Sequence, residues 1–367
     1  MKKFFVAIIF CFMIMLSSCS KKEEYPEYKF ELNEDGMSYT FAGLNDKNLK
    51  KIVIPATYND LPVTAIGEYV ITSTVESIYI SENIESVYGD IFGRSKNLKK
   101  VEVSKDNKKY DSRNNCNAII ETKTNTLVAG CVGTIIPDDI EIIGYGAFYL
   151  SEKTEIDIPS SVHTIEDYAF FWSRLDYVII PDSVKSIGES SFGRCSNLVS
   201  VKLSSNLESI GAGCFNNTPL TEIFIPKSVK KIDTGVFHLC RLLEKIEVDE
   251  DNEVYDSREN CNAIIETKAN KIIAGCRNTV ILEEIEIIGD SALTVYNREE
   301  TFIIPKNIKV IEPYGIFANS NCDPVLEFEN KTGWYYINSD GEKVDYDISG
   351  KEVNKNLFYQ SLTIYCD

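Results

Sequence analysis

The feature that most constrains the fold of this 367-residue chain is a motif that recurs about every 23 residues. In one clear copy, Ile180 begins the phrase IPDSVKSIGESSF, and Cys195 and Leu198 continue its apolar pattern in steps of three. A single copy cannot bury such a set of side chains, whereas stacked copies share one continuous core. The period therefore predicts a solenoid built of similar coils. Other copies begin at Ile80, Ile136, Ile158, Leu203, Ile225, Ile281 and Ile304.

Each copy contains the signals of a short strand followed by a tight turn. Residues 175–180 alternate as a strand does, and Pro181 ends the strand because proline has no backbone donor. A small polar residue such as Ser183 comes three residues after the last isoleucine, and such side chains bond to backbone groups in turns. After Gly188, the spacing to Phe192 favours a helical or 3₁₀ turn with an apolar inner face.

The phrase LDYVIIPDSVKSIGESSFGRC, from Leu175 to Cys195, resembles the BspA-like class of leucine-rich repeat. The resemblance covers residues 49–321, with five extra residues between Ile54 and Ile66. It implies a leucine-rich repeat solenoid, with parallel short strands along one face and turns or short helical segments on the other. It also implies display on a cell surface and attachment to host or neighbouring-cell components.

Both ends of the solenoid are expected to be capped, because bare terminal coils would expose apolar faces and strand edges. Residues 28–48 alternate on either side of the turn-forming run at 33–36 and predict a cap hairpin. Residues 322–367 predict a C-terminal cap, made of a final strand and an irregular lid.

The first residues predict a lipoprotein signal. Residues 1–18 contain Lys2, Lys3 and then an apolar run of about 13 residues, which is too short to span a bilayer. Small residues before Cys19 resemble a bacterial lipobox, which implies a lipid on Cys19; ordinary cleavage with a free thiol is the alternative. Residues 19–27 predict a flexible tether, whose charged SKKEE run loosely resembles the export signals of some Gram-negative surface lipoproteins. The expected location is extracytoplasmic, at the outer membrane and on the cell surface.

The mature chain is strongly acidic. Removing Lys2 and Lys3 with the signal leaves 36 of the 38 basic side chains against 56 acidic ones, a net charge of −20. Nucleic acids and anionic membranes need a basic binding surface. We therefore expect no nucleic acid partner, and contact with a membrane only through the lipid at Cys19.

Signals for catalysis are weak. The two histidines, His163 and His238, have no histidine partner four residues away and no Cys-x-x-Cys nearby, so no zinc site is predicted. The sequence contains no Gly-rich phosphate loop and no nucleophile elbow. The acidic run at residues 249–252 is interpreted as a polar turn rather than a calcium loop. We expect no metal, no cofactor and no enzymatic activity, with a hydrolase as the least favoured hypothesis.

The outward side chains of the strands define a candidate binding face. Two per strand point away from the core, and in one of these two columns seven of eleven residues are apolar or aromatic. Exposed apolar rows usually mark a binding surface, although β-branched and aromatic residues also favour strands for their own sake. We expect an extracellular or host protein as the partner; the alternative is a surface glycan, which exposed aromatics such as Phe171 and Trp172 could stack upon. The candidate anchors, drawn from both columns, are Tyr79, Ile135, Tyr177, Ile179, Phe224, Val280 and Ile303.

A cysteine-bearing stretch occurs twice, as YDSRNNCNAIIETKTNTLVAGC from Tyr110 and YDSRENCNAIIETKANKIIAGC from Tyr255, about 145 residues apart. Its alternation predicts a hairpin inserted before a coil. If residue 118 pairs with 129 and 120 with 127, both cysteines lie on one face and can form a disulfide. A bulge with Asn125 in the left-handed conformation would instead leave them on opposite faces as buried thiols. The bridges left open in this way are Cys116–Cys131 and Cys261–Cys276, and the C-terminal cap offers a third, Cys322–Cys366.

Overall fold

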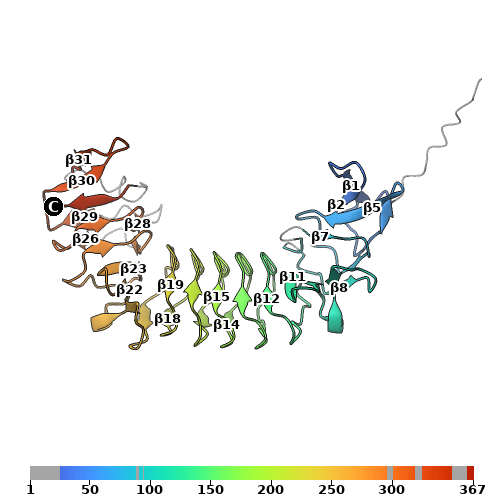
Figure 1. The fold of residues 1–367 in the computed structure, drawn as a ribbon, viewed down its shortest axis with the longest axis horizontal. Helices are drawn as coiled ribbons and strands as arrows, with labels where there is room; N and C mark the ends of the chain where they lie inside the picture. Colours follow the sequence, from blue (N-terminus) through green and yellow to red (C-terminus); the bar gives the residue numbers. More distant parts are fainter. Residues whose placement is uncertain (1–24, 88–90, 94, 296–300, 319–324, 349–361) are drawn as a thin grey trace, which may run out of the picture.

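The computed structural model describes residues 25–87, 91–93, 95–295, 301–318, 325–348 and 362–367. This part of the chain forms a solenoid bent into an arc, whose two ends rise on the same side (Figure 1). Strands and turns build nearly all of it. The helices among the described residues are the two 3₁₀ segments η1 (Arg113–Asn115) and η2 (Arg258–Asn260). The predicted repeat solenoid is confirmed.

One coil shows how the repeat folds. From Leu175 the chain passes through the long strand β14 (Tyr177–Ile179), turns after Pro181, and continues through the short strand β15 (Ser186–Ile187). It then returns through a series of turns to the next coil. The residues that the repeat pattern places inside are all buried in this coil: Leu175, Val178, Ile180, Val184, Ile187, Phe192, Cys195 and Leu198. Each large apolar side chain buried in this way stabilises the fold by about 1.5–3 kcal/mol.

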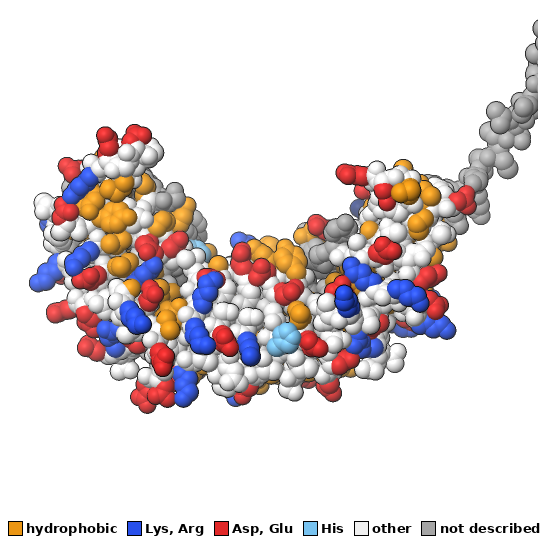
Figure 2. Space-filling view, viewed as in Figure 1, with side chains coloured by type: hydrophobic (Ala, Val, Ile, Leu, Met, Phe, Trp, Pro, Cys, Tyr) orange, Lys and Arg blue, Asp and Glu red, His pale blue; other side chains and the backbone are white. Residues whose placement is uncertain are grey.

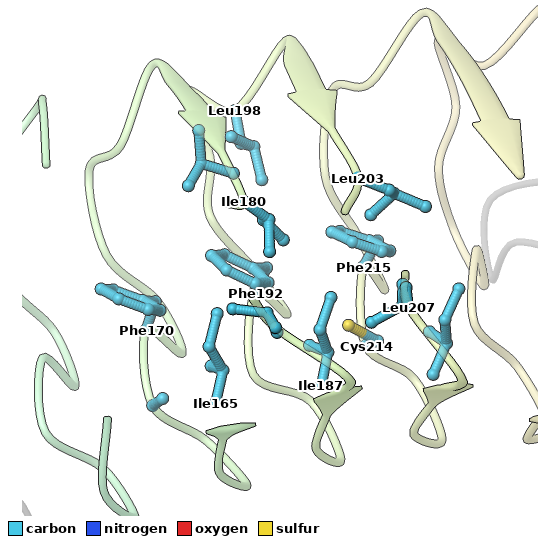
Figure 3. Packing of buried hydrophobic residues seen from close by; sticks show 14 of the residues in the cluster. Ile165, Phe170, Ile180, Ile187, Phe192, Leu198, Leu203, Leu207, Cys214 and Phe215 are labelled. Atoms are coloured by element: carbon cyan, nitrogen blue, oxygen red, sulfur yellow. The ribbon is translucent and has the colours of Figure 1, made fainter. Parts of the chain in front are cut away.

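The repeat phenylalanines form a stack through the middle of the core, with one ring per coil (Figure 3). Successive ring centroids are 5.2, 5.0, 5.6 and 6.0 Å apart, and the ring planes are within 19° of parallel. These separations follow the spacing of adjacent parallel strands, about 4.8 Å, and offset stacking is a favourable arrangement for aromatic rings. The stacked residues are Phe148, Phe170, Phe192, Phe215 and Phe237.

The segment after Gly188 differs from the predicted helical or 3₁₀ turn. It is a run of consecutive turns in which Ser190 and Arg194 have φ of 49° and 57°, in the left-handed region. These values let every second amide point along the solenoid axis. The amides of Ser190, Phe192 and Arg194 therefore donate to carbonyls of the next coil at 2.8–2.9 Å. Hydrogen bonds between coils thus take the place of a helical ladder.

The small polar residues of the tight turns also join the coils. Ser183 Oγ donates to the carbonyl of Val162 at 2.6 Å, and Ser161 Oγ to the carbonyl of Ile140 at 2.6 Å. Asn83 donates from its amide to the carbonyl of Ala56 in the same way. These three side chains belong to the predicted row, and each satisfies a backbone acceptor of the preceding coil. Ser228 stands in the same row, but its buried Oγ has no hydrogen-bond partner among the described residues.

The short strands form one continuous sheet through the central coils. Its eight strands follow the order β19-β17-β15-β13-β12-β11-β10-β9, and the coil strands pair in parallel. A second sheet of eight strands continues this side of the solenoid towards the C-terminus. Besides β15, the short coil strands are β12 (Ile142–Ile143), β13 (Thr164–Ile165), β17 (Ser209–Ile210), β19 (Lys231–Ile232), β24 (Ile287–Ile288) and β27 (Val310–Ile311).

The long strands, in contrast, form four separate small sheets. In Figure 1 the labels of β14, β18, β26 and β29 lie along the outer side of the arc, whereas β28 (Ile316–Ala318), paired with β25 (Leu293–Val295), lies on the inner side. Coils of a bent solenoid fan apart on the outer side, which interrupts the pairing there. Besides β14, the long strands are β3 (Lys51–Ile54), β6 (Ser77–Ile80), β8 (Lys100–Val103), β16 (Ser200–Lys202), β18 (Glu222–Ile225), β20 (Lys245–Val248), β26 (Thr301–Ile304) and β29 (Val325–Phe328).

The duplicated cysteine stretch folds as an inserted hairpin in both copies. The start of β11 pairs in parallel with β12, so the first hairpin extends the short-strand sheet. The second does the same through β23 and β24. The strands of the first copy are β9 (Tyr110–Asp111), β10 (Ala118–Glu121) and β11 (Thr126–Gly130), and those of the second are β21 (Tyr255–Asp256), β22 (Ala263–Glu266) and β23 (Lys271–Gly275).

The hairpin register is not the one that would place both cysteines on one face. Ile120 pairs with Leu127 as predicted, but a bulge shifts the pairing so that Ala118 lies opposite Gly130 rather than residue 129. Asn125 has φ of 50°, in the left-handed region. Because the bulge adds one residue to β11, the side chains beyond it point to the opposite face from the predicted one.

Each hairpin separates two parts of the core. Ile120 packs in the central cluster with the stacked phenylalanines, whereas Ile119 packs in the N-terminal cluster. In the second copy Ile264 belongs to the central cluster and Ile265 to the C-terminal one. Both faces of each hairpin are therefore buried. Figure 1 shows the arc bending near β11 and near β22, where these hairpins lie.

The two ends of the described chain are built from additional strands. At the N-terminal end, β1 (Tyr28–Leu32) and β2 (Tyr39–Leu44) pair antiparallel as a hairpin, and β2 joins β5 (Leu61–Ile66). At the other end, β29 pairs with β26 as a last long strand. The lid after it is more regular than expected, because an antiparallel group of three strands joins it to β27. The remaining strands are β4 (Thr57–Tyr58), β7 (Ser86–Val87), β30 (Trp334–Ile337), β31 (Lys343–Asp345) and β32 (Ile364–Cys366).

Candidate binding faces

The predicted anchors lie on the long-strand face, on the outer side of the arc. Six of the seven are exposed, with Ile135 at 75% and Ile179 at 57%, whereas Tyr79 is only half-buried and contributes less surface than expected. Alternation along the strand explains the exposure of Ile179 and Phe224, because the residues on either side of each are buried. The exposed anchors are Ile135, Tyr177, Ile179, Phe224, Val280 and Ile303.

The strand pairing sets the neighbours of each anchor across this face. Ile179 lies opposite Lys202, Phe224 opposite Glu247, and Ile303 opposite Glu327. The apolar column is therefore not a continuous stripe. Lys202 and Glu247 interrupt it beside Ile179 and Phe224, whereas Val53 and Tyr79 lie directly opposite each other at the N-terminal end.

Ion pairs hold several of these charged side chains on the same face. Lys245 Nζ lies 2.6 Å from Glu247, and Lys100 Nζ lies 2.9 Å from Glu102. Both pairs are more than half exposed. Exposed pairs of this kind contribute at most about 1 kcal/mol to stability, so their effect is to fix the charge pattern around the anchors.

A shallow pocket of about 220 Å³ opens beside Ile135. It lies between two coils that have no long strand, at residues 131–136 and 154–158, in the gap between β8 and β14. Lys153, Glu155 and Asp157 surround the apolar floor made by Ile136 and Ile156. The most exposed anchor thus stands at an opening in the long-strand face.

The cysteines of the described chain are all free thiols. The disulfides considered above are therefore corrected: Cys116 packs in the central cluster and Cys131 in the N-terminal one, on opposite faces of the hairpin. Cys261 and Cys276 are likewise unbridged, in different clusters. The free cysteines are Cys116, Cys131, Cys195, Cys214, Cys240, Cys261, Cys276 and Cys366.

Burial makes the repeat cysteines poor nucleophiles. It raises the pKa of Cys195 and Cys240 to about 11 and that of Cys214 to about 12. They remain protonated near neutral pH and act as small apolar side chains. Two of the predicted cysteine sites, the lipid site Cys19 and the bridge partner Cys322, lie outside the described residues.

The inner side of the arc carries an aromatic cluster that the sequence analysis found only in part. Ring contacts at 5.5–6.5 Å connect it from coil to coil, and the guanidinium of Arg194 lies 5.2 Å from the last ring. Figure 2 shows hydrophobic side chains gathered in the hollow of the arc, over the central coils. The sequence feature that could have indicated the whole cluster is the presence of further aromatic residues near the repeat phenylalanines. The cluster consists of Tyr69, Tyr145, Tyr149, Tyr168, Phe171 and Trp172.

A groove of about 550 Å³ begins at this cluster and crosses successive coils on the short-strand side. Tyr145 lines one end, and Lys231 and Asp233, an ion pair at 2.9 Å, line the other. Its volume is that of a typical small-ligand site. The groove could not be predicted from the sequence, because its lining comes from five coils. Its main polar residues are Thr164, Glu166, Asp167, Ser186, Glu189 and Ser209.

The two histidines are not brought together. His163 is exposed, and its Nε2 lies 3.5 Å from the carboxylate of Glu141. His238 belongs to a later coil, and burial lowers its pKa. Within the described ranges, no group of three or more His, Cys, Asp or Glu side chains has a metal-binding arrangement.

A family profile described as "BspA type Leucine rich repeat region" matches six copies in this chain, over residues 37–126 and 131–244. These ranges cover more than half of the sequence. The chain belongs to the BspA-type leucine-rich repeat family. The coils that the structure shows beyond residue 244, as far as β29, continue the same BspA-type stack outside the matched ranges.

Several solved structures of bacterial leucine-rich repeat proteins are similar to this chain. A leucine-rich cell surface protein of Faecalibacterium prausnitzii A2-165 is 25% identical, with a TM-score of 0.46, over 83% of this chain and 75% of that one. The pneumococcal vaccine antigen PcpA is 18% identical, with a TM-score of 0.35, over 83% of this chain and 65% of PcpA. A leucine-rich repeat protein of Eubacterium ventriosum is 15% identical, with a TM-score of 0.38, over 88% of this chain and 98% of that one. No curated protein sequence matches the chain.

Proposed function

We propose that this BspA-type chain is a lipid-anchored, extracytoplasmic binding protein. It holds an extracellular or host protein on its outer long-strand face and catalyses no reaction. The observation that carries this proposal is the set of exposed apolar side chains on the long-strand face, among which Ile179 and Phe224 lie beside charged neighbours.

Such a pattern suits a protein partner. Interfaces between proteins depend on a few apolar or aromatic anchors, which a polar surround shields from water. Phe224 and Ile179 can act as such anchors because strand backbones hold them rigidly, at little cost in conformational entropy on binding. The charges of Lys202 and Glu247 beside them would select a partner with a complementary pattern.

The absence of catalysis is part of the proposal and has its own support. The repeat thiols are buried and protonated, which disfavours them as nucleophiles. The family to which the chain belongs is defined by a repeat scaffold rather than by a reaction site.

Anchoring through Cys19 explains how a protein of this kind would be retained at a membrane. No helix in the described ranges has both the length and the apolar character needed to cross a bilayer. The proposed location is the outer membrane, with the solenoid facing the outside of a Gram-negative cell. Labelling with a clickable palmitate analogue should be lost in Cys19→Ala, and protease treatment of intact cells should remove the solenoid. Protection of the solenoid from the protease would refute surface display.

Site-specific photo-cross-linking tests the binding face. A benzoylphenylalanine at position 224 should form a defined adduct with a protein from extracellular matrix or host cells, identified by mass spectrometry. The matched control is Leu242, which is as exposed but lies outside the strands. Adding Tyr177→Lys should abolish the adduct at 224 without changing the melting temperature. Equal adducts from positions 224 and 242 would show that the face is not specific.

A further inference from the structure

The groove on the short-strand side runs over a column of residues that changes from coil to coil. The position after the second core isoleucine of each coil is in register from one coil to the next. It is occupied in turn by Gly144, Glu166, Gly188, Gly211 and Asp233. Two adjacent glycines, without side chains, therefore lie between the carboxylates of Glu166 and Asp233 in the lining of the groove.

Both glycines allow the coils to pack closely at these positions. A Cβ atom on Gly188 would lie 2.3 Å from Asp167 Oδ1, and one on Gly211 would lie 2.5 Å from the amide nitrogen of Glu189. The neighbouring coil therefore fills the place that a side chain would take, and a larger residue at either position would displace backbone.

Hydrogen bonds orient the carboxylates around the groove and leave an oxygen of each unused. Glu166 Oε2 accepts the amide of Tyr145 at 2.8 Å, and Asp167 Oδ1 accepts the amide of Glu189 at 2.7 Å. Glu189 Oε1 accepts the hydroxyl of Tyr168 at 2.6 Å. The second oxygen of each carboxylate has no hydrogen bond from a described residue, so it can accept one from a ligand.

The floor of the groove is a row of hydroxyl groups. Thr164, Ser186 and Ser209 lie side by side in β13, β15 and β17, and Lys231 continues the row. Hydroxyls donate and accept, carboxylates accept, and the ammonium of Lys231 donates. At one end the exposed ring of Tyr145 offers an apolar surface, which continues through Tyr168 into the aromatic cluster.

We propose that this groove binds a neutral, unbranched oligosaccharide. Sugar hydroxyls can donate to the unused carboxylate oxygens of Glu166 and Glu189 and accept from the serine hydroxyls. The C–H face of a pyranose ring can pack on Tyr145, as apolar surfaces do on aromatic rings. The surplus of carboxylates repels sulfated and carboxylated sugars, so the ligand is a neutral one. This site is separate from the proposed partner face, and neither proposal depends on the other.

The repeat distance of the groove favours a glycan over an extended peptide. The hydroxyl groups of Thr164, Ser186 and Ser209 recur once per coil, about every 4.8 Å, whereas side chains on one face of an extended peptide recur about every 6.7 Å. A peptide along the groove would therefore lose register after one or two residues. One pyranose residue of an extended chain is close to one coil in length, so successive sugars can each meet one hydroxyl group of the floor.

Calorimetric titration of the purified full-length protein tests the proposal. The probes are maltohexaose, cellohexaose, laminarihexaose and mannohexaose, with hexalysine as the cationic alternative. At least one hexasaccharide should bind, with a Kd between micromolar and millimolar. The variants Ser186→Lys and Ser209→Lys should each weaken that binding at least about tenfold, because a lysine blocks the floor and displaces bonded hydroxyls. Lys231 already occupies the equivalent place in the next coil, so the fold accepts this side chain.

Two controls make the outcome decisive. Phe224→Lys, on the outer face, should leave saccharide binding unchanged, and all variants should keep the melting temperature of the parent. Binding of hexalysine without any hexasaccharide would overturn the proposal in favour of a cationic partner. Failure of all four hexasaccharides to bind, or full binding by both folded lysine variants, would also overturn it.

Discussion

The two inserted hairpins have nearly the same sequence and backbone but different surroundings. Their turn asparagines, Asn125 and Asn270, have φ of 50° and 48°. In both, an aspartate accepts hydrogen bonds from the arginine two residues later. Arg113 Nε lies 2.9 Å from Asp111, and Arg258 Nε lies 2.8 Å from Asp256. The shared geometry therefore follows from the local sequence.

The neighbouring coil accounts for the differences between the copies. Arg113 also donates to Asp139 at 2.7 Å and to Asn125 at 3.0 Å, whereas Arg258 has only a looser contact, 3.7 Å from Glu284. The local sequence of the insert thus determines its conformation, whereas contacts with the neighbouring coil determine how strongly it is held in place. The following variants test that division, from the largest expected effect to the smallest.

Isoleucine truncation should show that each hairpin separates two parts of the core. Ile119→Ala and Ile264→Ala remove equivalent, fully buried side chains, and each should cost about 2–5 kcal/mol. Ile119→Ala should reduce hydrogen-exchange protection on the N-terminal side of the first hairpin, and Ile264→Ala in the central coils, because the two isoleucines belong to different clusters. Mass spectrometry of exchanged peptides locates the loss. Uniform loss along the solenoid in both variants would mean that the hairpins do not divide the core.

Arginine truncation should affect the two copies unequally. Arg113→Ala removes bonds to Asp111, Asp139 and Asn125, and should cost about 2 kcal/mol, since hydrogen bonds to charged groups contribute about 1.5–3 kcal/mol in favourable sites. Arg258→Ala removes fewer close contacts and should cost about 1 kcal/mol. Hydrogen exchange of the amides in each hairpin, followed during urea unfolding, measures both costs. Equal costs would show that Asp139 adds nothing to the first copy.

Acid should weaken both hairpins through the same aspartates. Burial alone would raise the pKa of Asp111 and Asp256, but hydrogen bonds from the arginine, a threonine and the backbone outweigh it and hold both below the ordinary value. Unfolding restores a pKa of about 3.9. The ionised carboxylates therefore stabilise the fold above that pH, and this contribution is lost as the pH falls through the folded pKa.

Urea unfolding at pH 5 and at pH 3 measures this loss. The parent should lose more stability between the two than Asp111→Asn or Asp256→Asn, because asparagine does not titrate. A parallel decline of all three proteins would assign the acid sensitivity to other groups.

Most of the fold could be predicted from the sequence, because the positions of Ile180, Ile187 and Phe192 recur with a fixed period and can be satisfied only by stacking. The return turns could not. Ser190 and Arg194 are not residue types that favour the left-handed region, and they adopt it because the next coil offers carbonyls in register. Contacts between coils thus override the local preference for a helical turn.

The candidate sites were predictable to different degrees. Exposure of anchors such as Ile179 and Phe224 follows from alternation along a single strand, which the sequence shows directly. The sequence left two hairpin registers open, with and without a bulge, because a shift of one residue changes the local alternation of side chains only slightly. The register with the bulge is the one that separates Cys116 from Cys131. The groove could not be predicted, because its lining residues come from several coils and are brought together only by the stacking register.

The last residue of each insert should show the smallest difference between the copies. Cys131 is buried and Cys276 only half-buried, and burial raises the pKa of both thiols. The reason lies two residues on: a Cβ on Gly133 would lie 2.2 Å from the carbonyl oxygen of Lys99, so the neighbouring coil packs closely there. The second copy has Asn278 instead, whose side chain amide donates to the carbonyl of Glu244 in the neighbouring coil at 3.2 Å.

Alkylation of the native protein with iodoacetamide should therefore modify Cys276 roughly tenfold faster than Cys131, since access to the thiol limits both reactions. Peptide mass spectrometry measures the two rates in one sample, and Cys276→Ser confirms the assignment. Gly133→Asn should bring the first copy closer to the second by exposing Cys131. Equal rates in the parent would mean that the neighbouring coil does not set the burial of this thiol. Four missing thiols in the unfolded, unreduced protein would mean that bridges form across both hairpins.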